Sequence, residues 1–447
     1  MTPTRGGAVL KFAIVGAGPA GFYTAEALTS ACPGCEIDMI ERLPTPYGLV
    51  RFGVAPDHQN TKTIQGVFAR IAEHEKIRFI GNVAIDRDIT CLELDNFYDA
   101  VILTAGVSDD APLGIEGADL PGVYGAAAFV GWYNAHPDCA RLDPSVDSPN
   151  AVIIGNGNVA LDCARVLSRS IAELSRSDIA THALKTLAHS KITEITVVGR
   201  RGPLDAKFTT VELMEFGQIE GVVAVADPRQ IPAEVDGSLG PRERRIAAKN
   251  LECFQAFAKA SSRLSPRRIN FAFHAQPAAV LGKDRVEAVR FERTVINNGR
   301  LASTGDFFEI PCGLLISAIG YRARPVGGYA LAPSGDHLEN SDGLIAPRLY
   351  VAGWLRRGPS GKIGTNRTDA EAIAMRISLE AVADRKKCGF DGLTQLLRQR
   401  GVQWTSLDDW KRIERAEIAA ARAGAPRLKF ASIESMLICA SGSADRN

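Results

Sequence analysis

Short apolar runs, each followed by a turn and a helical pattern, recur along the chain. Residues 10–15 (LKFAIV) and 151–154 (AVII) are two such runs, and a glycine-rich turn directly follows each of them. Continuous apolar runs of this length are typical of strands that are buried on both faces of a parallel sheet. The pattern therefore predicts an α/β protein. No apolar run approaches the roughly 18 residues that a membrane-spanning helix requires.

The first glycine-rich turn reads GAGPAG over residues 16–21, and a helical pattern and the apolar run IDMIE, which ends with Glu41, follow it. Strand, loop, helix, strand and acid in this order, within about 30 residues, indicate a dinucleotide-binding unit. In such a unit Gly16 makes the tight turn, Gly18 lets the pyrophosphate approach the backbone, and Gly21 lets the helix pack on the strand. The helix N-terminus attracts the phosphates, and Glu41 accepts hydrogen bonds from ribose hydroxyls.

The second turn, GNGNVA at residues 155–160, has the related GxGxxA pattern and leads into a helix expected from about Leu161 to Ala172. The apolar run EITVVG (194–199) comes next and ends in Arg200 and Arg201 instead of an acid. Guanidinium groups pair with a ribose 2′-phosphate, which a carboxylate would repel. The alternative is that both arginines are merely solvated surface charges, but their place at the end of the strand favours phosphate binding.

The two units together indicate a flavoprotein. The acid of the first unit suits the plain ribose of FAD and the arginines of the second suit NADP(H), so we expect a nicotinamide to pass hydride to a flavin. Two further apolar runs, at 99–107 and 314–321, end in small-residue turns, where we expect the chain to leave the first unit and return to it. The sequence thus predicts two Rossmann-like domains: an FAD domain made of residues 1–107 and 320–447, and an inserted NADP domain of residues 108–319.

Charge and cysteine content narrow the function further. Lys and Arg number 52 and Asp and Glu number 51, a net charge of +1, which excludes an overall charge adapted to nucleic acid or to an anionic membrane but leaves room for a local basic patch. The nine cysteines are scattered, and an odd number argues against a complete disulfide framework. The N-terminal MTPTRGG has no signal-peptide pattern, so the simplest expected compartment is the cytoplasm.

Cys32 and Cys35 form a CPGC sequence that has two interpretations. It is either a thioredoxin-like redox pair or a Pro-Gly turn between the first helix and the next strand. We favour the turn, because this connection lies near the adenosine end of a dinucleotide fold and no His or Lys stands beside the pair in the sequence to activate a thiolate.

A second glycine-rich segment, at residues 358–366, precedes a helical run. Backbone N–H groups at such a helix start can face an anion, such as the pyrimidine edge of a reduced flavin. It can equally be an ordinary helix start capped by Thr365, Asn366 or Thr368, and the two interpretations are compatible. Trp354, just after a strand end, is either a core residue or a cofactor contact, and its position favours the cofactor.

Four segments, in the order found in the family, resemble the adrenodoxin reductase type of ferredoxin–NADP reductase. They are PTPYGLVRFGVAPDH (Pro44–His58), GNGNVALD (Gly155–Asp162), GRRGPLDAKFTTVELME (Gly199–Glu215) and VAGWLRRGPSGKIGTN (Val351–Asn366). The resemblance covers nearly the whole chain. It implies electron transfer from NADPH through FAD to a 2Fe–2S ferredoxin. No cysteine spacing in this chain suits an iron–sulfur cluster, so the cluster is expected on the partner.

The resemblance also implies which residues bind the cofactors. The implied FAD contacts, besides the first glycine loop, are Ala20, Glu41, Leu49, Val83, Trp354 and the backbone of Gly361, Lys362 and Ile363. The implied NADP contacts are Asn156, Gly157, Asn158, Val159, Arg200, Arg201 and Glu212, with Gly361 near the nicotinamide. Lys362 stands where an apolar residue is expected, but its backbone contact is retained because the amide is unchanged.

His58 precedes a helix that the pattern predicts at roughly Asn60–His74. In the family a histidine at this place lies near the nicotinamide with a glutamate that matches Glu215, which implies roles in positioning and proton handling for this pair. Glu212 has a rival interpretation, because Thr209-x-x-Glu212 fits a helix capping box.

An acidic ferredoxin requires a basic docking face. The candidates are Pro241–Arg245 with Lys249, Ser265–Arg268, and Arg356 with Arg357. Each can also be a solvated charge run. The family resemblance favours docking at Arg242, Arg244 and Arg245.

Other functions stay open. A disulfide or quinone reductase (diaphorase) is possible, although a disulfide reductase needs a cysteine pair at the flavin. A subunit of a larger enzyme such as glutamate synthase usually carries extra N-terminal cysteine clusters, and an NADP-binding redox sensor needs neither the His58–Glu215 pair nor a docking face. The tail from about Gly401 reads as helices with a strand-like PRLKF, and we expect it to pack on the FAD domain.

Overall fold

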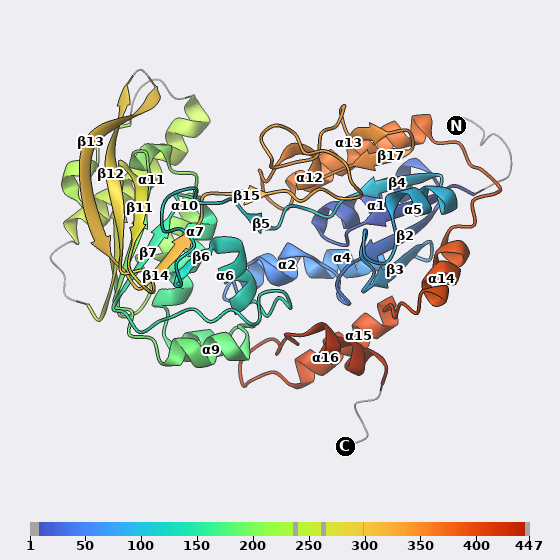
Figure 1. Ribbon diagram of the computed structural model, residues 1–447, viewed down its shortest axis with the longest axis horizontal. Coiled ribbons are helices and arrows are strands. Elements are labelled where there is room, and N and C mark those ends of the chain that lie inside the picture. The colour runs from blue at the N-terminus through green and yellow to red at the C-terminus, as the bar shows by residue number, and fades with distance from the viewer. Residues whose placement is uncertain (1–8, 236–239, 261–264, 298, 443–447) are drawn as a thin grey trace.

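The computed structural model describes residues 9–235, 240–260, 265–297 and 299–442. Within them the chain forms two lobes, each built on a six-stranded sheet (Figure 1). The first sheet has the order β16-β17-β4-β1-β2-β3, with every neighbouring pair parallel except β16 and β17. Its strands are β1 (Lys11–Val15), β2 (Glu36–Glu41), β3 (Ile77–Gly81), β4 (Ala100–Leu103), β16 (Leu344–Ala346) and β17 (Leu349–Val351).

The second sheet has the order β6-β14-β7-β8-β10-β9, and all its neighbouring strands are parallel. Its strands are β6 (Val123–Gly125), β7 (Asn150–Ile154), β8 (Glu194–Val198), β9 (Val222–Ala226), β10 (Arg267–Ala272) and β14 (Leu314–Ser317). An antiparallel sheet adjoins this lobe (Figure 1), formed by β11 (Ala275–Leu281), β12 (Ala288–Asn297) and β13 (Arg300–Pro311). The α/β class with parallel sheets is confirmed.

Helices connect and cover the strands. Those of the first half are α1 (Pro19–Ala31), α2 (Leu49–Phe52), α3 (Gln59–Lys62), α4 (Gln65–Ala72), α5 (Cys91–Phe97), α6 (Ala126–Tyr133), α7 (Asn158–Ser168), α8 (Ile171–Ser175) and α9 (Thr181–Ala188). Those of the second half are α10 (Thr210–Glu215), α11 (Pro241–Lys259), α12 (Trp354–Arg357), α13 (Thr365–Glu380), α14 (Phe390–Gln399), α15 (Leu407–Ala419) and α16 (Ile433–Ala440). Two 3₁₀ turns, η1 (Pro203–Asp205) and η2 (Pro228–Gln230), complete the set.

Two short paired strands join the lobes. β5 (Asp109–Asp110) follows the first sheet's β4 and pairs antiparallel with β15 (Tyr321–Arg322), which follows the second sheet's β14. Both lie between the lobes in Figure 1. The chain therefore leaves the first sheet and returns to it along neighbouring paths.

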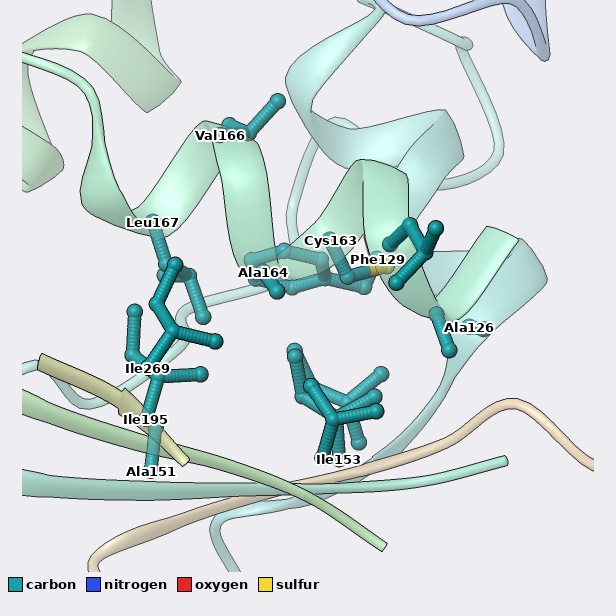
Figure 2. Close-up of a cluster of buried hydrophobic side chains, with 14 of the residues drawn as sticks. Ala126, Phe129, Ala151, Ile153, Cys163, Ala164, Val166, Leu167, Ile195 and Ile269 are labelled. Atoms are coloured by element: carbon teal, nitrogen blue, oxygen red, sulfur yellow. The ribbon is translucent and has the colours of Figure 1, made fainter. Parts of the chain in front are cut away.

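Helix α7 packs its apolar face on the second sheet (Figure 2). Leu167 points toward Ile195 and Ile269, and Phe129 of α6 lies beside Cys163. These side chains are at most 3 % exposed. Burial of each large apolar side chain contributes about 1.5–3 kcal/mol, so this contact fixes the position of the glycine loop that begins α7.

Three element predictions are wrong in detail. The helix expected at Asn60–His74 is two helices, α3 and α4, separated by a turn where the Thr63 hydroxyl donates to the Asn60 carbonyl at 2.6 Å. A Thr hydroxyl that bonds the backbone in this way competes with helix continuation. The helix expected at Leu161–Ala172 begins earlier, at Asn158, and ends at Ser168 before α8. The strand-like PRLKF forms no strand.

The C-terminal tail packs on the first lobe, as expected. Ser406 and Asp409 form a capping box that begins α15. The α15 side chain Trp410 contacts Tyr47 edge-on, with ring centroids 5.6 Å apart. The tail also reaches the second lobe, because the Arg422 guanidinium donates to the Ile179 carbonyl at 2.8 Å.

Candidate functional site

The first glycine loop has the close contacts that the motif requires. Gly16 has φ +113°, and a Cβ there would lie 2.6 Å from the Thr104 carbonyl oxygen. A Cβ on Gly21 would lie 2.0 Å from the Gly16 oxygen. Gly18 is different, because the nearest atom to its virtual Cβ is 3.9 Å away. The outer glycines thus serve the tight turn and the helix packing, and the middle glycine leaves open space before α1.

This space fits a pyrophosphate. Helix α1 begins after Gly18, and no side chain caps it, so its first N–H groups are available to an anion. At the end of β2, the Glu41 carboxylate accepts the N–H groups of Ala17 at 2.9 Å and Leu43 at 3.1 Å. Burial raises the pKa of Glu41. A carboxylate has about four acceptor positions, so Glu41 retains capacity for ribose hydroxyls.

The second loop repeats this arrangement at the start of α7. Gly155 has φ +142°, and a Cβ there would lie 2.3 Å from the Ala318 carbonyl oxygen. Gly157 has no atom within 4 Å of its virtual Cβ, and no side chain caps the helix. Asn156 lies against Gly199, and its buried Oδ1 has no partner among the described residues. An open loop with an unpaired buried acceptor fits a second dinucleotide.

The residues that surround this loop lie where their sequence predicts. Arg200 and Arg201 follow β8 after one intervening residue, Gly199, and are both exposed, with Arg201 Nη1 3.9 Å from Asp205 Oδ1. Asn158 accepts the Thr209 N–H at 2.8 Å through its side chain, so it also holds α10 against the loop. Val159 lies in the first turn of α7.

The short helix α12 and the loop of residues 358–364 lead directly into α13. Trp354 donates its indole N–H to the Ser360 carbonyl at 3.0 Å and lies 5.6 Å from the Tyr321 ring. No side chain caps α13, which begins after Gly364. The capping interpretation of Thr365 and Asn366 is therefore wrong: Thr365 accepts the Lys362 N–H at 3.1 Å, and Asn366 accepts from Arg357 at 2.9 Å.

The other residues implied for FAD lie in the same lobe. Ala20, in the first turn of α1, closely approaches Gly353, where a Cβ would lie 2.5 Å from the Ala20 Cβ. Leu49 begins α2, and Val83 is buried with its N–H bonded to the Glu41 carbonyl at 2.9 Å. Gly361 has φ +83°, and Lys362 and Ile363 follow it toward α13.

His58 and Glu215 meet between the lobes. His58 Nε2 lies 3.1 Å from Glu215 Oε2 and 3.5 Å from Glu212 Oε2. Both glutamates belong to α10, three residues apart and therefore on one helix face. Glu212 does not form the capping box with Thr209, because no side chain caps α10, and it faces His58 instead. Burial raises the pKa of Glu212.

Arg165 and Asp57 belong to the same cluster, and the sequence motifs do not reveal them. The Arg165 side chain is 0 % exposed and contacts four carboxylates. It lies 2.7 Å from Asp57 and Asp162, and 3.4 Å from Glu212 and Glu215. Burial opposes the charge of Asp57, but its bond to Arg165 prevails and lowers its pKa. Burial raises the pKa of Asp162.

One sequence signal could have found Arg165. Leu161, Ala164, Arg165 and Ser168 share the buried face of α7, so a charged side chain stands at a core position of an otherwise apolar stripe. A charge at such a position is stable only with partners, which predicts carboxylates facing it.

The three basic candidates differ in their surroundings. Arg244 and Arg245 are exposed on α11, whereas the side chain of Arg242 lies outside the described set. Arg267 donates to the Ser168 carbonyl at 3.0 Å, and Arg356 pairs with Asp369 at 2.5 Å. These contacts tie the second and third candidates into the fold and leave α11 as the open basic face.

Cys32 and Cys35 lie on the connection between α1 and β2, as expected, and both are buried free thiols. Burial raises the pKa of Cys35 to about 12. A thiol in this state is a poor nucleophile at neutral pH.

Two glycine loops that each begin a helix, with an acid after the first unit and arginines after the second, are typical of a flavin-dependent pyridine-nucleotide oxidoreductase. Residues 10–204 match the family model described as pyridine nucleotide-disulphide oxidoreductase. The chain is 39 % identical to the NADPH-ferredoxin reductase FprA of Mycobacterium leprae, over 95 % of this chain and 97 % of that protein. It is also 39 % identical to the mitochondrial NADPH:adrenodoxin oxidoreductase of Arabidopsis thaliana, over 96 % and 95 %.

A solved structure agrees. Mycobacterium tuberculosis FprA in complex with NADPH superimposes with a TM-score of 0.92 at 38 % identity, covering 97 % of this chain and all of that one. The chain therefore belongs to the NADPH–ferredoxin reductase family of the adrenodoxin reductase type, whose members are FAD enzymes. Among the described residues, no helix is both long and apolar enough to cross a membrane.

Proposed function

We propose that this enzyme oxidises NADPH at the second glycine loop and passes the electrons through FAD, held by the first loop, to a 2Fe–2S ferredoxin. The observation that carries the proposal is the contact of His58 with Glu215, which joins the segment after α2 in the FAD lobe to α10 in the NADP lobe. When bound, FAD accepts a hydride from the nicotinamide and releases electrons singly to a metal centre.

The FAD site consists of the first loop and the segment around Trp354. The N–H groups at the start of α1 hold the pyrophosphate, and Glu41 holds the ribose. Ala20, Leu49, Val83 and Trp354 border the site, and the backbone of Gly361, Lys362 and Ile363 faces the flavin end. The open space at Gly18 and the uncapped α1 support this assignment.

The NADP site consists of residues 155–160 with Arg200 and Arg201. The N–H groups at the α7 N-terminus hold the phosphates, the unpaired Asn156 Oδ1 accepts from a nucleotide hydroxyl, and the two arginines pair with the 2′-phosphate. Glu212, at the far end of this site, lies with Glu215 beside the nicotinamide. Hydride transfer requires no general base, so His58 and Glu215 orient the reactants and do not remove a proton.

The acceptor docks on the exposed start of α11, through Arg242, Arg244 and Arg245. Iron–sulfur proteins of this kind are acidic, and a basic face steers them to the enzyme. The exposure of Arg244 and Arg245 supports this assignment.

The domain division and the compartment are also part of the proposal. The FAD domain comprises residues 1–107 and 320–447, and the NADP domain comprises 108–319. The membership of the two sheets and the pairing of β5 with β15 support these bounds. Nine free thiols support a cytoplasmic location.

The test of the nucleotide assignment is anaerobic reduction of the purified yellow protein. We expect NADPH to bleach the flavin absorbance rapidly and NADH to do so far more slowly at equal concentration. Equal rates with both nucleotides would contradict the assignment of Arg200 and Arg201. No bleaching with either would contradict the proposed function and favour the NADP-binding sensor.

A further inference from the structure

The connection between α15 and α16 lies at the junction of the two lobes. It comprises residues 420–432, a fully described stretch without helix or strand. Phe430 packs against the core of the first lobe, and its neighbour Ala431 packs against the core of the second. Two cationic side chains of this connection, Arg422 and Lys429, bond it further to the second lobe.

Arg422 bonds the turn between α8 and α9. Its guanidinium donates to the Ile179 carbonyl at 2.8 Å. Two longer contacts reach the carbonyls of Ser175 at 3.3 Å and Ser177 at 3.4 Å. A charged donor forms stronger hydrogen bonds than a neutral one, so this single side chain ties the turn to the tail.

Lys429 bonds both lobes at once. Its Nζ lies 3.2 Å from the Arg51 carbonyl oxygen in the first lobe. In the second lobe it lies 3.1 Å from Asn134 Oδ1 and 3.2 Å from Asp178 Oδ2. An ammonium group has three N–H donors, and these acceptors use all of them. The side chain is 0 % exposed, so water does not compete for the bonds.

Lys429 shares Asp178 with the segment that carries His58. Lys62 Nζ lies 2.7 Å from Asp178 Oδ1, and the Gln59 side-chain amide donates to the same oxygen at 3.1 Å. Gln59 and Lys62 are one and four residues after His58. The place of His58 relative to α10 therefore depends on how firmly this segment is held against the second lobe.

We propose that Arg422 and Lys429 are positioning residues, which clamp the second lobe to the first and thereby set the approach of His58 to α10. Their effect on hydride transfer rests on the proposed function, because that function places the two cofactors on different lobes. A displacement of about 1 Å between reacting groups can slow a reaction about 100-fold. The clamp itself can be measured without any turnover.

Arg422→Ala is the first test, because Arg422 is only half-buried and the variant leaves both cores intact. In the FAD-loaded protein we expect faster hydrogen exchange of the backbone amides in the α8–α9 turn. We also expect flavin reduction at saturating NADPH to become several-fold slower in anaerobic stopped flow. The affinity for NADP⁺, measured by titration, should stay unchanged, because the variant alters neither glycine loop.

Arg412→Ala is the matched control in the same tail. Arg412 bonds Asp409 at 2.8 Å and the Ala440 carbonyl, and both partners belong to the tail. We expect this variant to behave as the wild type. Equal exchange in the two variants would overturn the clamp. Faster exchange in Arg422→Ala without slower flavin reduction, or with weaker NADP⁺ binding, would overturn the positioning role.

Lys429→Met tests the second member of the clamp. It keeps the length of the side chain, and Lys62 remains as the counter-ion of Asp178. We expect the same pattern of slower flavin reduction and unchanged NADP⁺ affinity, and a wild-type rate would exclude Lys429 from the clamp. If this variant does not fold, Arg422→Ala still decides the proposal.

The outcome is separable from the proposed function. A wild-type protein that NADPH does not reduce would refute that function, and with it the effect on hydride transfer. The comparison of hydrogen exchange in Arg422→Ala and Arg412→Ala would still decide whether the tail clamps the lobes.

Discussion

At the scale of single residues, the environment of each charge decides its role. Arg165 is fully buried among four carboxylates, whereas Arg200 and Arg201 are exposed beside a loop that is open to a ligand. A buried arginine with bonded partners fixes its neighbours, and exposed arginines at a strand end are free to bind phosphate. The same residue type thus has a structural role at Arg165, and in the proposed function it sets the nucleotide specificity at Arg200 and Arg201.

Replacement of Arg200 and Arg201 by Ala is expected to lower kcat/KM far more for NADPH than for NADH. Each charged hydrogen bond to the 2′-phosphate contributes about 1.5–3 kcal/mol, and NADH lacks that group. Steady-state kcat/KM for both nucleotides measures the change. Arg229→Ala is the control, because Arg229 is 89 % exposed and already pairs with Asp227. A similar loss for NADH would show that the arginines act on some other part of the nucleotide.

Replacement of Cys32 and Cys35 by Ser is expected to leave NADPH oxidation and ferredoxin reduction unchanged. Both thiols are buried at the α1–β2 connection, and burial raises the pKa of each. The measurement is ferredoxin-dependent turnover before and after treatment with an alkylating reagent. A large loss of turnover would support the alternative function as a disulfide reductase.

At the scale of elements, a buried ionic cluster joins three segments that are distant in sequence. Asp178, between α8 and α9, lies 2.7 Å from Lys62 of α3 and 3.2 Å from Lys429 of the tail. All three side chains are at most 5 % exposed. Lys62 is one helical turn after His58, so the cluster anchors the short helix α3 that follows His58.

Asp178→Asn is expected to destabilise the protein by about 3–5 kcal/mol at pH 7, because it leaves two buried ammonium groups without a counter-ion. Burial opposes the charge of Asp178, but the charges of Lys429 and Lys62 prevail and lower its pKa to about 2. A lowered carboxyl pKa contributes stability above the unfolded pKa, near 3.8, and loses it as the pH falls toward 2. The deficit of the variant should therefore be constant from pH 7 to about pH 5 and shrink below about pH 4.

Denaturant unfolding of wild type and variant at several pH values measures this deficit. Asp284→Asn, at an exposed turn, is the control and should match the wild type throughout. A deficit that does not depend on pH would show that the carboxylate charge is not its cause.

Sequence patterns predict those elements whose structure depends on residues that are neighbours in the chain. Both glycine loops, the strands beside them, Glu41 and the arginine pair lie where the patterns place them, because each motif needs only neighbouring residues to form its turn. The sequence pattern does not show the break between α3 and α4, where the Thr63 hydroxyl donates to the Asn60 carbonyl. Glu212 has two interpretations in the sequence, a capping box with Thr209 and a contact with His58. Only the packing of the two lobes against each other distinguishes them.

The sequence can mark Arg165 as a buried charge on α7, but it cannot identify the carboxylates that pair with it. Its partners Asp57 and Glu215 lie about one hundred residues before it and fifty after it along the chain, and only the packing of α7, α10 and the segment after α2 brings them together. The assignment of His58 with Glu215 came from family resemblance, and the structure brings the two side chains into contact.

At the scale of the whole molecule, the proposed function requires NADPH and an acidic electron acceptor to bind at separate sites. The near-zero net charge means that the basic start of α11 is offset by acidic residues elsewhere. A local patch of this kind steers an acidic partner without attracting polyanions in general.

Arg244→Ala with Arg245→Ala is expected to raise the KM for ferredoxin several-fold at low ionic strength and to leave ferricyanide reduction unchanged. The difference should shrink as salt increases, because the Debye length falls to about 8 Å at 0.15 M. Lys259→Gln is the control, on the same helix but about 21 Å away at 1.5 Å per residue. An equal effect of both variants would contradict docking at the start of α11.

The central claim is that electrons flow from NADPH through FAD to ferredoxin, and cytochrome c reduction tests it most directly. The purified protein is assayed with NADPH or NADH, with and without a 2Fe–2S ferredoxin from the same source. The account predicts a rate that is large only when NADPH and ferredoxin are both present. A slow rate that ferredoxin does not change would contradict it and direct attention to quinone or disulfide acceptors.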